Sequence, residues 1–192
     1  MPALRSDAVR SRARILEVAR RHDPGDLRLN ELAREAGVGV GTVYRHFPTT
    51  HALVEALAQD TLERLRALAR EAVAEPDPGR AMAGLLRSAL DLQLEEGGLQ
   101  PVLLSTEDEA EDVRAAKREI VAGFEEVLER ARAAGLVRAD LTAAQVEHLI
   151  CGLEHAVRLG TTTDRGPYLE ILLAGLRPAQ AAGVPPRATR TD

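Results

Sequence analysis

The segment from Leu29 to Pro48 limits the possible folds most strongly, because its apolar residues describe two short helices that cross steeply. The first helix is predicted over residues 29–36 and ends at Gly37, since glycine readily adopts the left-handed conformation that stops a helix. The second is predicted over residues 40–47. The positions that would pack the two helices together are Leu32, Ala33, Ala36, Val38, Val43 and Phe47. An ordinary αα-hairpin has the same spacing, so spacing alone does not decide between a hairpin and a DNA-reading unit.

The remaining face of the second helix is small or hydrogen-bonding and carries no acid; it comprises Val40, Gly41, Thr42, Tyr44, Arg45 and His46. Such a surface fits a major groove about 12 Å wide. The net charge of the chain is −5, but residues 1–50 hold nine arginines against six acids, a net charge of +3, and residues 51–192 carry −8. A polyanion would therefore be attracted to the first part of the chain and repelled by the rest.

Composition predicts an all-α protein. Aromatic residues make up only 2%, so Leu, Val, Ile and Ala must form most of the core, and abundant Arg and Glu favour helices over strands. Residues 1–9 are interpreted as a loose basic arm, and Thr142 with Gln145 as a capping box. About nine helices are expected, over residues 8–21, 29–36, 40–47, 50–74, 80–95, 99–105, 109–134, 143–159 and 167–177.

The run from Ala36 to Pro48, followed by Ala52-Leu53-Val54, resembles the N-terminal domain of TetR-family regulators. The resemblance implies a three-helix helix-turn-helix domain, a variable helical bundle that binds an effector, and a homodimer formed mainly by the last two long helices. The corresponding division is residues 1–50 for the basic arm and DNA-binding domain, 51–180 for effector binding and dimerisation, and 181–192 for a disordered tail. Candidate interface residues are Leu149, Leu153, Leu169 and Leu173.

Carried onto this sequence, the resemblance implies that Thr42, Tyr44 and His46 contact DNA phosphates. It places Val40, Gly41 and Arg45 near base edges, and Arg28 and Gly39 close to the DNA backbone. The arginines of the first segment are further candidates for phosphate contacts: Arg5, Arg10, Arg12 and Arg14. The sequence departs from the family where Arg28 replaces a capping Thr or Ser, where Gly39 replaces a frequent Ser, and where Thr50 and His51 replace a common Lys-Glu pair. The implied function is a ligand-responsive repressor that binds double-stranded DNA at a pseudo-palindromic operator.

Other classes fit less well. A single cysteine, the lack of an apolar leader and the lack of a 20-residue apolar segment favour a cytoplasmic protein. No nucleophile–base pair, glycine-rich phosphate loop or paired catalytic carboxylates indicate an enzyme, and no cofactor is expected. The alternative is a helical dimeric binding protein whose DNA-reading role has been lost.

Three further groups have both a functional and a structural interpretation. His148, Cys151 and His155 share one face of a helix, as zinc or copper ligands would, or as residues packed at a dimer interface would. The acidic run over residues 107–112 suits a hard cation or simply the positive N-terminal end of a helix. Phe124 and Tyr168 are candidate effector contacts in a pocket that is otherwise aliphatic.

Overall fold

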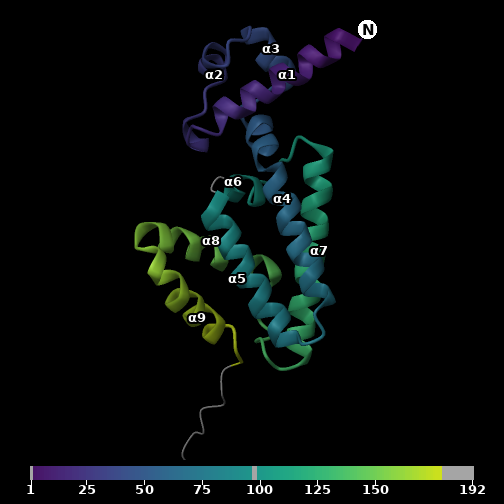
Figure 1. Cartoon of the computed structure of the whole chain (residues 1–192). Helices are drawn as coiled ribbons and strands as arrows, with labels where there is room; N and C mark the ends of the chain where they lie inside the picture. The colour runs from purple at the N-terminus through teal and green to yellow at the C-terminus, as the bar shows by residue number, and fades with distance from the viewer. Residues whose placement is uncertain (1, 97–98, 179–192) are drawn as a thin grey trace, which may run out of the picture.

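The computed structural model describes residues 2–96 and 99–178, and all regular structure in these residues is helical. Nine α-helices and two short 3₁₀ helices follow one another within the described ranges (Figure 1). Their bounds are α1 Pro2–Ala19, η1 Pro24–Asp26, α2 Leu29–Glu35, α3 Val40–His46, α4 Thr50–Ala74, α5 Pro78–Glu96, α6 Leu99–Leu103, α7 Glu111–Ala133, α8 Ala143–Leu159, η2 Thr162–Asp164 and α9 Arg165–Gly175. The predicted fold class is therefore confirmed.

The first three helices form a cap at one end of α4, and α5 to α9 pack along the rest of the molecule (Figure 1). Helix α4 runs from the cap into the bundle, where its main neighbours are α7 and α5. One hydrophobic core joins α1, α2 and α3 to the first half of α4 and continues into α6 and α7 through Val102 and Val113. That core crosses the predicted domain boundary at residue 50, so packed side chains connect the cap with the bundle.

The beginning of α1 differs from the prediction. Residues 2–9 belong to the helix rather than to a loose arm. Nothing between Pro2 and Ala8 breaks a helix, and proline is well tolerated in the first turn, where its missing N–H costs no hydrogen bond. The predicted tail over residues 181–192 lies outside the described residues.

Sequence signals for helix ends were more accurate. Thr142 and Gln145 form the expected capping box at the start of α8, with Gln145 N donating to Thr142 Oγ1 at 3.2 Å and Thr142 N to Gln145 Oε1 at 2.8 Å. Gly135 has a φ of 69° and ends α7. Both features depend only on neighbouring residues, which explains why the sequence revealed them.

One of the four proposed interface leucines is wrong. Leu169 is buried within the protomer's own core, and Leu153 and Leu173 are partly buried against the same cluster. The apolar side chains of α8 and α9 that remain open are Leu149, Leu159 and Ile171, with exposed fractions of 45%, 77% and 69%. The sequence misplaced Leu169 because α9 packs a different stripe inward than its spacing suggested.

Candidate nucleic-acid interface

The turn between α2 and α3 closes in a way that only glycine accommodates without strain. Gly37 has a φ of 62°, its N–H donates to Arg34 O at 3.2 Å, and Val38 N donates to Ala33 O at 3.0 Å. These two bonds satisfy carbonyls that the end of α2 would otherwise leave unpaired. Ala33 is 1% exposed, so the small side chain faces the packed interior of the unit. The turn at Gly37 and the close packing at Ala33 together fix the angle at which α2 and α3 cross.

We expect Gly37→Ala to destabilise the protein by about 1 kcal/mol, because an L-residue is strained at a positive φ. A Cβ at this position would meet no atom within 4 Å, so the cost is conformational rather than steric. Gly41→Ala is the matched control, since Gly41 is helical and its Cβ would also enter open space. Urea unfolding of both variants checks the prediction; equal destabilisation by the two changes would contradict it.

Helix α3 is held by two anchors on its inner side. Val43 is fully buried and Phe47 is 2% exposed. The guanidinium of Arg12, on α1, lies over the Phe47 ring with Cζ 5.4 Å from the ring centroid. Such a cation–π contact is worth about 0.5–1 kcal/mol at a partly exposed site. Arg12 therefore helps to fix the end of α3.

The outer side of α3 carries the residues that the sequence singled out. Val40 and Tyr44 are each 45% exposed, and Gly41 and Arg45 are also exposed. Thr42 and His46 are half-buried at its margins. This exposed face of a seven-residue helix combines apolar, aromatic and hydrogen-bonding side chains, which suits it to contact with a macromolecule.

The caps of the two short helices follow the departures noted in the sequence. Arg28 precedes α2 and Gly39 precedes α3, and neither provides a side-chain capping bond. Arg28 is exposed, and its Nη1 donates to Leu27 O at 3.2 Å. Gly39 leaves the first amides of α3 without a side-chain acceptor, and free amides at a helix N-terminus attract anions such as phosphate.

Arg45 is folded back onto its own helix. Its Nε donates to Gly41 O at 3.0 Å and its Nη2 donates to Thr42 Oγ1 at 3.2 Å. The guanidinium must release these bonds before it can reach a base edge. Both bonds are exposed, so their loss to water costs little.

The surroundings of His46 favour the neutral form of its imidazole. Burial, followed by the positive charges of Arg12 and Arg45, lowers the pKa of His46 below its ordinary value of 6.5. Its ring centroid lies 6.2 Å from that of Phe47 in a tilted arrangement. A negative group placed beside the imidazole would reverse this shift, since an opposite charge favours the protonated form.

The arginines of α1 do not act alike. Arg12 packs on Phe47, Arg10 pairs with Asp7, and Arg14 is exposed. The side chain of Arg5 lies outside the described part of the chain. Arg10 and Arg14 are therefore open to a phosphate, whereas Arg12 is engaged by the Phe47 ring.

The start of α4 contains a buried carboxylate that the sequence did not reveal. Glu55 is 1% exposed and accepts hydrogen bonds from Glu109 N at 2.7 Å and Ala110 N at 2.9 Å. Ala110 precedes α7 and provides no side-chain cap itself, so Glu55 caps α7 from a neighbouring helix. His51 Nε2 lies 3.1 Å from Glu55 Oε1. Only the return of the loop over residues 104–110 to α4 creates this contact.

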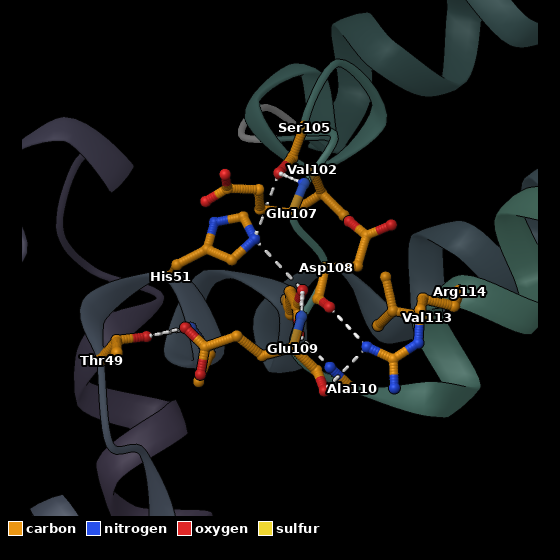
Figure 2. Close-up of polar contacts among 12 residues, drawn as sticks. Thr49, His51, Val102, Ser105, Glu107, Asp108, Glu109, Ala110, Val113 and Arg114 are labelled. Atoms are coloured by element: carbon orange, nitrogen blue, oxygen red, sulfur yellow. Dashed lines mark hydrogen bonds and ion pairs between the residues drawn. The ribbon is translucent and has the colours of Figure 1, made fainter.

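That loop is also tied to α7 (Figure 2). Lys117 Nζ donates to Val102 O at 3.0 Å, to Ser105 O at 2.6 Å and to Asp108 Oδ1 at 2.9 Å. Arg114 Nη1 donates to the carbonyl of Asp108 at 2.5 Å. Within the acidic run, Asp108 thus pairs with a lysine, and Glu111 and Asp112 lie in the first turn of α7, as the structural interpretation predicts. One hydrogen-bonded junction is thus formed by the loop over residues 104–110, by α7 and by the first turn of α4.

One group of possible metal ligands converges among the described residues, and it consists of His51, Glu55 and Asp108. Their ligand atoms lie within 4.8 Å of one another. Glu55 already accepts two backbone amides, and Asp108 is paired with Lys117. These donors hold the oxygens that a cation would need, so we interpret the group as part of the junction.

The predicted candidates His148, Cys151 and His155 do not form a group with ligand atoms within 4.8 Å of one another in the described part of the chain. Both histidines are exposed, whereas Cys151 is 6% exposed. Burial, together with the carboxylates of Glu147 and Glu154, raises the pKa of Cys151 to about 11. A metal ligand must be a thiolate, so this environment opposes metal binding by the cysteine.

An apolar cavity of about 70 Å³ lies where α4, α5, α6, α7 and α8 meet. Of the two aromatic candidates, Phe124 lines this cavity and Tyr168, on α9, does not. Two polar side chains, Gln93 and Glu147, complete the walls. Gln93 is 4% exposed, and its Oε1 has no hydrogen-bond partner among the described residues. A buried unpaired acceptor costs about 1–3 kcal/mol.

A larger hollow is of a different kind. It has a volume of about 780 Å³ and lies between the cap and the bundle, bordered by η1, α4 and α8. Charged side chains such as Arg20, Asp23 and Glu154 line it. This charged lining differs from the mostly apolar lining that is typical of a small-molecule site. No described helix is both long and apolar enough to cross a membrane.

Comparison with known families assigns both parts of the chain. Residues 13–57 match the family described as bacterial regulatory proteins, tetR family. Residues 77–178 match the C-terminal domain of SbtR-like transcriptional regulators. No curated protein matches the sequence. The first match contains the whole of α2 and α3, and the second contains the cavity-lining helices α5 to α8.

Solved structures agree with this assignment. A TetR transcriptional regulator from Streptomyces coelicolor is 31% identical, with 88% of this chain and 99% of that chain covered and a TM-score of 0.51. Two more distant structures share the fold: FadR from Bacillus subtilis with stearoyl-CoA (17% identical, 88% and 99% covered, TM-score 0.54) and LfrR from Mycobacterium smegmatis with proflavine (22% identical, 87% and 95% covered, TM-score 0.56). The chain belongs to the TetR family of transcription regulators, which are DNA-binding proteins and not enzymes.

Proposed function

We propose that this regulator is a ligand-responsive repressor that binds a pseudo-palindromic operator as a homodimer in the cytoplasm. The observation that carries the proposal is the outer face of α3, where Val40 and Tyr44 are exposed beside Arg45 while Val43 and Phe47 anchor the helix. A rigid helix with an exposed reading face is what recognition in a major groove requires.

The proposed contacts divide into two kinds. Thr42, Tyr44 and His46 would bind phosphates, which position the protein but do not read sequence. Val40 would contact a thymine methyl group, Gly41 would allow close approach of a base pair, and Arg45 would hold a guanine. The amides after Arg28 and Gly39 would face the DNA backbone.

A dimer would use the open apolar side chains of α8 and α9. Leu149, Leu159 and Ile171 are exposed on these two helices, and pairing with a second copy would bury them. The two copies of α3 would then lie about 34–36 Å apart, one turn of DNA. Sedimentation at micromolar concentration is expected to find a dimer, and Leu149→Glu with Ile171→Glu should produce a monomer. A wild-type monomer would contradict the proposal.

The cavity among α4 to α8 is the proposed effector site. Its wall includes Leu103 of α6, and the chain then runs through the loop that Glu55 and Lys117 hold. A ligand that moves α6 would therefore pull on the first turn of α4, which directly follows α3. FadR and LfrR were each solved with a small molecule, which supports a ligand-dependent role for this chain. The coupling must be reciprocal, so DNA would weaken effector binding by the same factor.

DNA binding should strengthen as the pH falls. The pKa of His46 is lowered in the free protein, and a nearby phosphate would raise it, so binding would take up a proton. The affinity for DNA should rise as the pH falls from about 7.5 towards 6, and should level off below the pKa that His46 has in the free protein. The same lowered pKa makes folding less stable as the pH falls through about 6.5. Titration of wild type and His46→Gln at each pH checks this; an unchanged slope in the variant would refute it.

Selection of bound sequences from random duplex DNA tests the proposal as a whole. We expect an enriched site made of two related half-sites, centred about one helical turn apart. Enrichment of no sequence, with a folded dimer present, would instead favour a binding protein that has lost its DNA-reading role. The Tyr44→Ala variant is the control for enrichment that does not depend on α3.

A further inference from the structure

The proposed effector cavity has an unusual balance of charge. Most of its wall is aliphatic, with Phe124 as the aromatic member. The polar lining side chains are Gln93, on α5, and Glu147, on α8, and no Lys or Arg of the described residues contributes to the wall. Apolar pockets select their ligands through such few polar groups. Both side chains offer oxygen atoms that accept hydrogen bonds, so we expect the ligand of this cavity to provide hydrogen-bond donors.

Gln93 is the first of these acceptors. Its backbone is fixed, because Arg158 Nη2 donates to Gln93 O at 2.9 Å. Its side chain is 4% exposed, and Oε1 accepts no hydrogen bond from the described protein. Buried polar atoms almost always have a partner, so an acceptor left open beside a cavity indicates a group that arrives with a ligand.

Glu147 is the second acceptor. Burial raises its pKa, whereas His148 and Lys117 act in the opposite direction. Lys117 is itself held by Ser105 O, Val102 O and Asp108, and it does not line the cavity. The carboxylate of Glu147 would repel an anionic ligand in this apolar surrounding and attract a cation.

We propose that the cavity binds a hydrophobic amine, whose protonated nitrogen donates to Glu147 and Gln93 and whose apolar body contacts Phe124 and the aliphatic walls. The proposal rests on the ligand-responsive function put forward above and specifies its ligand class. It separates this chain from a regulator of fatty acids or acyl-coenzyme A, whose ligands are anionic. A protonated amine provides both the charge and the several N–H donors that the two side chains accept.

The size of the cavity links binding to a structural change. Its volume of about 70 Å³ is below the roughly 150 Å³ that accommodates benzene in an apolar cavity. An amine with more than a few carbons must therefore displace side chains from the wall. Val121 lines the cavity and is 42% exposed, so the wall there reaches the surface and is the place where the ligand's apolar chain would emerge. Displacement of Leu103 would move α6 and the loop that Glu55 holds.

Three matched probes test the ligand class: hexylamine, hexanol and hexanoate, each titrated calorimetrically into the full chain without DNA at pH 7. Hexylamine should bind at least tenfold more tightly than hexanol, and hexanoate should be the weakest. Glu147→Gln should remove the preference for the amine over the alcohol. Gln93→Met, which keeps the length of the side chain, should weaken the binding of hexylamine severalfold and raise the melting temperature of the protein. Glu126→Gln, an exposed change on α7, is the control and should leave all three affinities unchanged.

The outcomes separate this inference from the proposed function. Hexanoate binding as tightly as hexylamine, or an amine preference that survives Glu147→Gln, would overturn the ligand class whether or not the protein binds DNA. An amine preference that depends on Glu147, but leaves the selected operator bound, would support the inference and contradict ligand-responsive repression. Release of the operator by hexylamine in the wild type, and not in Glu147→Gln, would support both.

Discussion

Glu55→Ala is expected to destabilise the protein by about 3 kcal/mol. The change leaves the amides of Glu109 and Ala110 without an acceptor in a part-buried site, and each such loss costs about 1–3 kcal/mol. It also removes a negative charge from the N-terminal end of α7, where the helix dipole favours one. For a chain of this length, the melting temperature should fall by roughly 10 °C.

Glu63→Ala on the same helix is the matched control. Glu63 is exposed and pairs with Arg66 at 2.7 Å, an arrangement worth about 0–1 kcal/mol in water. Denaturant unfolding and thermal melting of both variants measure the difference. A loss for Glu55→Ala no larger than that for Glu63→Ala would show that the junction does not stabilise the fold, and the proposed route from α6 to α4 would lose its physical basis.

The second large effect concerns α3. Tyr44→Ala should lower the affinity for operator and random DNA together, because phosphate contacts carry no sequence information. Arg45→Ala should instead reduce the ratio of the operator affinity to the random-DNA affinity by about 10- to 100-fold. A bidentate arginine–guanine pair supplies about 1–3 kcal/mol of this discrimination. Neither residue is buried, so the fold and the dimer should survive both changes.

Tyr44→Phe removes only the hydroxyl group and is the control for Tyr44→Ala. Titration of each variant on operator and on random DNA at fixed salt measures the ratio of the two affinities. Arg45 reaches a base only by releasing Gly41 O and Thr42 Oγ1, so its helix-bound form is the free state. If Arg45→Ala reduced both affinities equally and flattened the salt dependence, Arg45 would be a phosphate contact instead.

The parts of this molecule that the sequence predicted are those determined by near neighbours along the chain. The turn at Gly37 and the capping box at Thr142 need only a few residues in one order, and both were found. The spacing also predicted α2 and α3, which are short and adjacent, whereas the three-helix domain as a whole was expected from the family resemblance of residues 36–54. Its inner positions, Val43 and Phe47, are buried as their spacing predicted.

The parts that escaped prediction depend on distant pairs. Glu55 reads as one more acid on an amphipathic helix, and only the return of the chain 54 and 55 residues later gives it two amides to cap. Gln93 and Glu147 approach one cavity from separate helices, which no local pattern indicates. Leu169 was misassigned because the direction of an apolar stripe, inward or towards a partner, is fixed by tertiary packing.

The central claim is that α3 reads duplex DNA, and titration of the dimer on the selected duplex and on a shuffled duplex of the same length tests it most directly. Measurements should extend between about 50 and 200 mM salt, where phosphate contacts dominate the dependence. We predict that both affinities fall log-linearly with salt and that the selected duplex binds about 10³-fold or more tightly throughout. Equal affinities for the two duplexes, or no binding by a folded dimer at the lowest salt, would contradict the account.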